Sequence, residues 1–465
     1  MVVKRRGKLL SNRRVPTLRK FNRGYDHGYN IGHTKGFESG LEKGRVGFST
    51  PLEGTSIIIP TFNQLPYLRA CIESIRKFTP EPHEIIVIDN ASTDGTAEYL
   101  RSICGQVRFR ICAENLGFAG GVNQGLMRAR GTTMLFLNND TIVTEGWLTK
   151  LLACLHLSDK FGLVGPVTNF ISGDQLIAAD YPSLSEMHKF AKAHALVNAN
   201  QWKSTQRMTG FCVLMSRTVF QQLGYLDEGF KIGNCEDDDY SLRIKLMGLQ
   251  LIIAVDTFIH HAGSKTITAF TPAQFTEIYQ TNLQFYANKW GDPNSLLAET
   301  IPSWDGSTLK MKDFYPTHMA VRGTEPIIYW IEHGIRYLIE PSEGVNAVRL
   351  SQIDLWSFPL GGSLPRDHYE RKLFILLAGQ PGVESGESEV SEVSEELMEG
   401  SIICAPDGRL YQYQHGATHR FATELTVKMW NLDSRPHRSL TEAVWSKYPV
   451  GRPIIAPPTI QSPTI

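Results

Sequence analysis

The sequence has 465 residues, with 42 % hydrophobic and 20 % charged residues, as in ordinary globular proteins. Lys plus Arg and Asp plus Glu number 47 each, and this balance argues against a general nucleic-acid binder. The length exceeds the ~250–300 residues at which one core stops growing, so two or three domains are expected.

Residues 1–48 form a basic arm in which a glycine recurs at every fourth position from Gly24 to Gly44. A period near four is helical, but each glycine costs a helix about 1 kcal/mol relative to alanine, so the arm is not expected to form a helix alone. Two interpretations stay open. The arm is disordered, or its glycines let a second helix approach closely, which would make a homo-oligomer through the arm.

Residues 50–300 are predicted to form an α/β domain, because short apolar runs alternate with amphipathic helical patterns. The first runs are Ser56–Pro60, Glu84–Asp89, Val107–Ile111 and Met134–Leu137. Repeated βα units with continuous apolar strands indicate a Rossmann-like, mostly parallel sheet with helices on both faces. Ligands bind such sheets outside the carboxyl ends of the strands, and polar residues gather at those ends here.

Two of these strand ends suit a nucleotide. Asp89 leaves the second run and can accept a hydrogen bond from a base N–H or a ribose hydroxyl, while Ser92 resembles a helix N-cap. The alternative is an Asx turn with a cap. Glu114–Gly125 joins a strand to a helix, and its glycines permit close backbone approach at a helix N-terminus, where diphosphates bind. A simple turn is the alternative there.

Three further motifs suit a cation and a base. Asn138-Asn139-Asp140 follows an apolar strand and offers oxygen ligands for a divalent ion, or else a capping turn. Glu236–Asp239 places four carboxylates at a helix start, which the helix dipole favours but mutual repulsion opposes, and Asp237 is the candidate base. His260-His261 ends a strand and points to opposite faces, so at most one histidine is expected in the site.

In this order the motifs resemble family 2 glycosyltransferases of the GT-A fold, in particular the rhamnosyltransferase-like bacterial branch. The resemblance covers residues from about 55 to 266, less than half of the chain. Seven stretches carry it: Ile59–Asn63, Asp89–Thr96, Asn115–Ala119, Leu137–Asp140, Thr209–Cys212, Glu236–Asp239 and His260–His261.

The resemblance implies inverting transfer from a UDP- or dTDP-sugar to a hydroxyl of a glycan or glycoprotein, as in polysaccharide biosynthesis, with Asp237 as general base. Asp140, the last residue of the family's DxD motif, would bind Mg²⁺ or Mn²⁺, and His260 or His261 would complete the metal shell. The implied nucleotide-sugar contacts are Thr61, Asp89, Ser92, Asn115, Asn123, Asn139 and Asp140. Asn138 replaces the first DxD carboxylate, which predicts weak metal binding without nucleotide.

Residues 315–370 and 401–455 are predicted to be two copies of a small β-rich repeat, joined by an acidic flexible linker at 380–400. Two pairs of stretches match: Tyr329–Gly334 with Tyr411–Gly416, and Trp356–Gly361 with Trp445–Gly451. The pattern of each copy predicts a small β-hairpin with a Gly turn after the first strand. The aromatic residues of the repeats either bind a glycan or protein partner or form the core of a small scaffold.

Two other classes of function stay open. A non-catalytic binding or assembly protein on a degenerate glycosyltransferase fold would use the arm and the repeats, but the retained Asp140 and Asp237 argue against it. A nucleotidyltransferase predicts a Gly-rich basic loop after the first strand, which Pro60–Gln64 lacks. Seven cysteines without a CxxC pair, and no apolar run of ~18–20 residues, predict a cytoplasmic protein without a transmembrane segment, either free or peripheral to a membrane or surface assembly.

Overall fold

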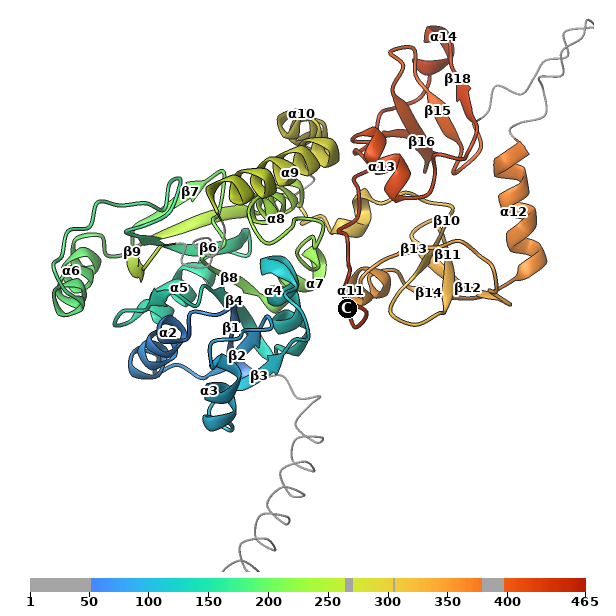
Figure 1. Ribbon diagram of the computed structural model, residues 1–465. Coiled ribbons are helices and arrows are strands. Elements are labelled where there is room, and N and C mark those ends of the chain that lie inside the picture. The colour runs from blue at the N-terminus through green and yellow to red at the C-terminus, as the bar shows by residue number, and fades with distance from the viewer. Residues whose placement is uncertain (1–51, 264–270, 304–305, 379–396) are drawn as a thin grey trace, which may run out of the picture. The chain divides into compact units, whose positions relative to one another are not determined.

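The computed structural model describes residues 52–263, 271–303, 306–378 and 397–465 (Figure 1). The basic arm and most of the 380–400 linker lie outside these ranges. Contacts divide the chain into Met1–Leu52 and a second compact unit, Glu53–Ile465. Within the described ranges, no helix has both the length and the apolar character needed to cross a membrane.

A central sheet forms the first half of the second unit. Its strands are β1 (Leu52–Thr61), β2 (His83–Asp89), β3 (Arg108–Ile111), β4 (Gly131–Leu137), β5 (Thr141–Ile142), β6 (Phe161–Thr168), β7 (Trp202–Thr205), β8 (Cys212–Ser216) and β9 (Gln250–His261). Over the described residues the order is β3-β2-β1-β4-β8-β6-β9-β5, with β7 paired to β9. Strand β1 is parallel to β2, β2 to β3, and β6 to β9.

The sheet is buried on both faces, which explains its continuous apolar strands. Ile58 of β1 belongs to one hydrophobic cluster, while its neighbours Ile57 and Ile59 belong to the other. The prediction of an α/β domain on a mostly parallel sheet is confirmed. The sequence did not predict β8, which runs antiparallel between β4 and β6.

Helices cover the sheet on both sides. They are α2 (Leu65–Phe78), α3 (Thr96–Ser102), α4 (Gly117–Arg128), α5 (Trp147–Leu155), α6 (Leu184–Val197), α7 (Arg217–Leu223), α8 (Glu236–Leu246), α9 (Pro272–Trp290) and α10 (Pro293–Thr300). Apolar residues of α2 and α5 join one cluster, and those of α4 and α8 join the other. The glycines of α4 bring this helix against β1, because a Cβ on Gly125 would overlap the side chain of Ile58.

Two smaller sheets follow two 3-10 turns (Ile301–Ser303 and Met311–Phe314). The first module contains β10 (Met319–Arg322), β11 (Ile328–Glu332), β12 (Ile335–Glu340), β13 (Val348–Arg349), α11 (Gln352–Trp356), β14 (Leu360–Pro365) and α12 (Arg366–Ala378). The second module contains β15 (Ile402–Cys404), β16 (Leu410–Gln414), β17 (Ala417–Arg420), α13 (Glu424–Met429), β18 (His437–Ser439) and α14 (Glu442–Trp445).

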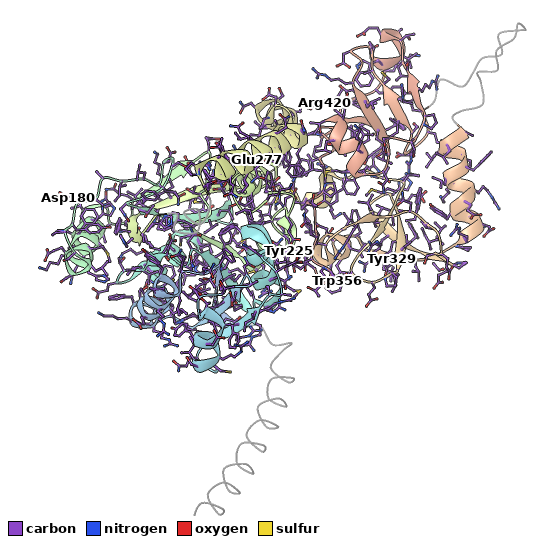
Figure 2. All side chains as sticks on the ribbon, in the orientation of Figure 1. Asp180, Tyr225, Glu277, Tyr329, Trp356 and Arg420 are labelled. Atoms are coloured by element: carbon purple, nitrogen blue, oxygen red, sulfur yellow. The ribbon has the colours of Figure 1, made fainter. Side chains whose placement is uncertain are left out.

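The two modules repeat the same order of pairings. The antiparallel hairpin β11–β12 matches β16–β17, and the parallel pair β10–β13 matches β15–β18. The aromatic residues of the repeat differ in their surroundings. Trp330 is buried and Trp445 packs on Tyr411, but Trp356 is 64 % exposed (Figure 2).

The modules share a core with the central sheet. One hydrophobic cluster runs from Ile58 of β1 through Trp290 of α9 to Trp430 and Ile455. Polar contacts reinforce this junction, since both Gln461 and Ser462 donate backbone N–H groups to the Glu228 carboxylate. The C-terminal segment is therefore part of the packing of the central domain.

Candidate functional site

A cavity of about 730 Å³ opens at the carboxyl ends of β1 and β4. This is the edge where an α/β sheet is expected to bind its ligand. The polar residues that line it include Thr61, Asn90, Asn115, Asn138, Asn139, Asp140, Asn169, Arg207, Glu236, Asp237 and His261.

Asp140 and His261 meet in this cavity. Strand β5, which directly follows Asp140, pairs with the end of β9, and Thr141 lies opposite His261. The pairing brings Oδ1 of Asp140 to 3.2 Å from Nε2 of His261. Asn169 holds the backbone of His261 by accepting from its N–H and donating to its carbonyl, at 2.9 and 3.1 Å.

The tautomer of His261 follows from its second nitrogen. Nδ1 lies 2.7 Å from the carbonyl oxygen of Phe170, so it carries the proton and donates. In the neutral imidazole, Nε2 then presents its lone pair toward the Asp140 carboxylate and the Asn138 amide, whose nitrogen lies 3.4 Å away. The two electron-rich atoms, Nε2 and Oδ1 of Asp140, repel each other unless a proton or a cation lies between them, so the pair fits a divalent metal ion.

His260 lies on the other face of β9. Its Nδ1 is 2.7 Å from the hydroxyl oxygen of Tyr181, and it does not line the cavity. Burial, together with the neighbouring His261, lowers the pKa of His260. The structure thus brings only one of the two predicted histidines, His261, to the site.

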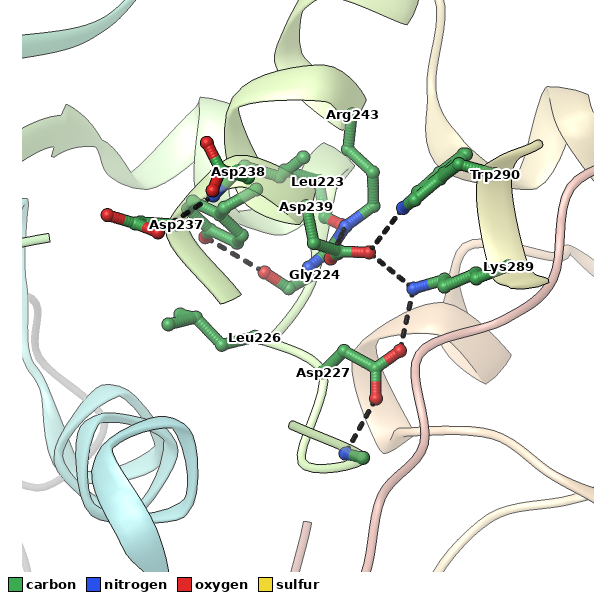
Figure 3. A network of polar contacts seen from close by, with 12 residues as sticks. Leu223, Gly224, Leu226, Asp227, Asp237, Asp238, Asp239, Arg243, Lys289 and Trp290 are labelled. Carbon is green, nitrogen blue, oxygen red and sulfur yellow. Dashed lines mark hydrogen bonds and ion pairs between the residues drawn. The ribbon is translucent and has the colours of Figure 1, made fainter. Parts of the chain in front are cut away.

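The carboxylates at the start of α8 point in different directions (Figure 3). Asp237 lines the cavity, and its Oδ2 accepts from the N–H of Gly210 at 3.2 Å. Asp239 faces away and is fully buried. It accepts from Lys289 at 2.5 Å and from Arg243 at 2.9 Å. Although burial alone would raise it, these two cations hold the pKa of Asp239 below its usual value.

Besides the cations around Asp239, raised pKa values also reduce the repulsion expected among the four carboxylates. Burial, and then the charge of Asp237, raises the pKa of Glu236 far above its usual range. The same two causes raise the pKa of Asp238 to about 6, against the nearby guanidinium of Arg207. Both shifts favour the protonated, neutral form of the acid, which reduces the negative charge beside Asp237.

Comparison with known proteins identifies the family of the domain that contains the cavity. Residues 56–224 match the model for Glycosyl transferase family 2. The chain carries a family 2 glycosyltransferase domain. The predicted family is confirmed. The matched stretch ends before Asp237 and His261. These two residues are assigned to the same domain because they line one cavity with Asp140.

The relatives of the family 2 domain are distant. The O-antigen biosynthesis protein RfbC of Myxococcus xanthus is 27 % identical over 261 residues, which are 52 % of this chain and only 20 % of that protein. The N-acetylglucosaminyl-diphospho-decaprenol L-rhamnosyltransferase of Mycobacterium tuberculosis is 23 % identical over 241 residues, 45 % of this chain and 76 % of the relative. A crystal structure of GalNAc-T7 with UDP, GalNAc and Mn²⁺ aligns with a TM-score of 0.41 at 17 % identity, covering 55 % of this chain and 52 % of that one.

The predicted nucleotide residues of the family 2 domain divide into two groups. Thr61, Asn115 and Asn139 line the cavity, and the Asn139 amide donates to the Thr61 hydroxyl at 2.8 Å. Asp89 is buried directly before the cavity residue Asn90. Its Oδ1 accepts from the N–H of Ser92, and its Oδ2 has no hydrogen-bond partner among the described residues.

Two expectations in this region need correction. Ser92 is not a helix cap, because α3 begins at Thr96 and the Ser92 hydroxyl instead accepts from the N–H of Asn63. Asn123 does not reach the cavity. It is fully buried and hydrogen-bonds both the N–H and the carbonyl of Leu226. Gly121 and Gly125 of α4 pack against β1, since a Cβ on them would meet Pro60 and Ile58, whereas Gly117 lines the cavity.

Sequence reasoning missed Arg207 and Asn169. Arg207 lies in the loop before β8, 3.5 Å from Asp237 and 2.5 Å from Asp238, and it adds a cation to the cavity. A single arginine in a polar loop carries no pattern. Asn169 could have been found, because it follows the apolar run Phe161–Thr168 in the same way that Asn138 follows β4.

Proposed function

We propose that this chain is an inverting glycosyltransferase, which moves a sugar from a nucleotide-diphosphate donor to a hydroxyl of a glycan or glycoprotein. One observation carries the proposal: the Asp140–His261 pair and Asp237 line the same cavity at the strand ends. The reaction needs positive charge for the leaving diphosphate and a base for the acceptor hydroxyl. A cation held by Asp140 and His261 would supply the positive charge, and Asp237 would act as the base.

Asp140 and His261 are the residues that would hold Mg²⁺ or Mn²⁺. The ion, when bound, would neutralise charge on the departing diphosphate. The protein's own contribution is to fix the ligands. The Phe170 carbonyl sets the His261 tautomer, and the ring of Phe211 stacks on that imidazole at 5.5 Å between centroids. Two protein ligands leave room for the diphosphate oxygens, which agrees with the weak nucleotide-free metal binding expected from Asn138.

Asp237 takes the proton of the acceptor hydroxyl. As this O–H bond breaks, the acceptor oxygen attacks the anomeric carbon, and the bond to the diphosphate oxygen breaks with its electron pair. The configuration at the anomeric carbon inverts. The N–H of Gly210 orients the Asp237 carboxylate, while Arg207 places a fixed positive charge beside the reacting groups.

The nucleoside would bind at the ends of β1 and β2. Among the described residues, Oδ2 of Asp89 is a buried acceptor without a partner, and such an oxygen is costly without a donor. A base N–H or a ribose hydroxyl would supply that donor. Asn90, whose Oδ1 also has no partner among the described residues, lines the cavity next to Asp89.

A donor screen tests this function. The chain is incubated with UDP-, dTDP- and GDP-sugars, with Mn²⁺ or with EDTA. Thermal stability and release of the nucleoside diphosphate are then measured. We expect one nucleotide class to raise the melting temperature and to be slowly hydrolysed, both only with the metal. Metal-dependent stabilisation without turnover, in the presence of any acceptor glycan, would favour the non-catalytic binding protein instead.

A further inference from the structure

The two C-terminal modules place a histidine at the same point of equivalent hairpin turns. His333-Gly334 closes the hairpin β11–β12, and His415-Gly416 closes β16–β17. Both histidines have a left-handed backbone conformation, with φ of 51° and 49°. Asn is the residue that such two-residue turns favour at this point. Histidine also adopts this conformation more often than most residues, and both turns carry one at the same position.

The two rings meet in the folded chain. Their centroids lie 5.5 Å apart. Glu399 joins them, and one ligand atom each from His333, Glu399 and His415 lies within 4.8 Å of the other two. Residues far apart in the sequence therefore converge on one point between the two modules.

Glu399 presents an oxygen to this point. Its Oε1 accepts from the N–H of His415 at 2.6 Å, which holds the second turn. In the first module the Thr317 hydroxyl holds the His333 N–H in the same way, and each of these residues precedes its histidine by sixteen positions. A hydroxyl is sufficient for that contact. The carboxylate adds a second oxygen, Oε2, which is buried and has no hydrogen-bond partner among the described residues.

We propose that His333, His415 and Glu399 bind a divalent transition-metal ion, with Zn²⁺ as the best match. Two imidazole nitrogens and one carboxylate oxygen are a common zinc ligand set, and the exposed histidines leave a fourth position for water. Ligand atoms around tetrahedral zinc lie about 3.4 Å apart, so small rotations of the two exposed rings close the site.

The ion would tie the two modules together through their turns. Each module supplies one histidine, and the carboxylate comes from the residues just before β15. This site is separate from the cavity of the family 2 domain, whose metal pair is Asp140 and His261. Zinc bound at the turns would act on the module structure rather than on the sugar transfer.

Zinc binding by the full chain tests the proposal. The protein is prepared without a polyhistidine tag, and EDTA removes any bound metal. It is then dialysed against micromolar Zn²⁺, and bound zinc is measured by mass spectrometry. We expect His333→Ala and His415→Ala each to lose one zinc per chain. Glu399→Gln, which keeps the turn contact, should weaken binding by roughly tenfold or more.

Two controls separate this site from others. His368→Ala, an exposed histidine on α12, should keep all bound zinc. His261→Ala should keep the turn site even if it loses metal at the cavity, so failure of the proposed transferase site leaves this test intact. The proposal is overturned if the double variant His333→Ala/His415→Ala binds as much zinc as wild type. It is also overturned if zinc binding depends on dimer formation, because the ligands would then come from two chains.

Discussion

Replacing Lys289 with methionine removes the cation that joins α9 to α8. Lys289 is fully buried and donates to Asp227 at 2.6 Å and to Asp239 at 2.5 Å (Figure 3). Methionine fills much of the same space but leaves two buried carboxylates with less compensation. Removing one partner of a buried ion pair costs about 3–5 kcal/mol, and we expect a loss of this size at pH 7.

The pH dependence of this loss provides a further check. The pKa of Asp239 is lowered in the folded protein, so its contribution to stability is present above its unfolded pKa and disappears as the pH falls through the folded value. In the methionine variant that contribution is largely missing. The difference between variant and wild type should therefore be largest above about pH 5 and should shrink below about pH 4.

Urea unfolding followed by tryptophan fluorescence measures the effect, and Trp290 reports directly because its indole N–H donates to Asp239. Lys189→Met is the matched control. Lys189 is 72 % exposed in its pair with Glu186, and its loss should cost less than about 1 kcal/mol. A loss of similar size in the Lys289 and Lys189 variants would refute the view that the buried cation stabilises α8.

Three more predictions concern the cavity and its supports. Glu236→Gln should keep kcat within about threefold of wild type, or about 0.65 kcal/mol of barrier, because burial and the charge of Asp237 raise the pKa of Glu236 and favour the neutral form that Gln mimics; an altered pH–rate profile would contradict this. Asn123→Ala should lower stability by about 1–3 kcal/mol through the unpaired backbone of Leu226, without changing the KM for the donor. Gly125→Ala should cost about 1–3 kcal/mol in chemical denaturation, since its Cβ would overlap Ile58, and an unchanged midpoint would show that α4 can shift.

The sequence predicted the parallel part of the sheet well because each strand is an apolar run that ends in polar residues. That same pattern placed Thr61, Asn139 and Asp140 at one edge, where they line one cavity. Spacing along the chain could not choose between His260 and His261. The choice depends on the pairing of β5 with β9, which places His261 opposite Thr141 and beside Asp140.

Other distinctions within the site depend on partners that are distant in the sequence. Asp237 and Asp239 look alike in an acidic run, but only Asp239 has Lys289, fifty residues away, as a partner. Asn123 resembled a nucleotide contact in a Gly-rich segment. Its partner Leu226 lies 103 residues further on, and Gly125 fits against Ile58 of β1.

In the proposed mechanism, Asp140 serves metal-dependent nucleotide binding and Asp237 serves proton removal within one cavity. Calorimetric titration with the preferred nucleoside diphosphate and Mn²⁺, paired with turnover of the matching donor, tests it most directly. Asp237→Asn should bind the nucleotide as wild type does while losing about 10²–10⁴-fold in kcat, and Asp140→Asn should lose both. Full turnover by a folded Asp237→Asn variant would contradict the role of Asp237 as base, and metal-dependent binding that survives in Asp140→Asn would contradict the role of Asp140 as metal ligand.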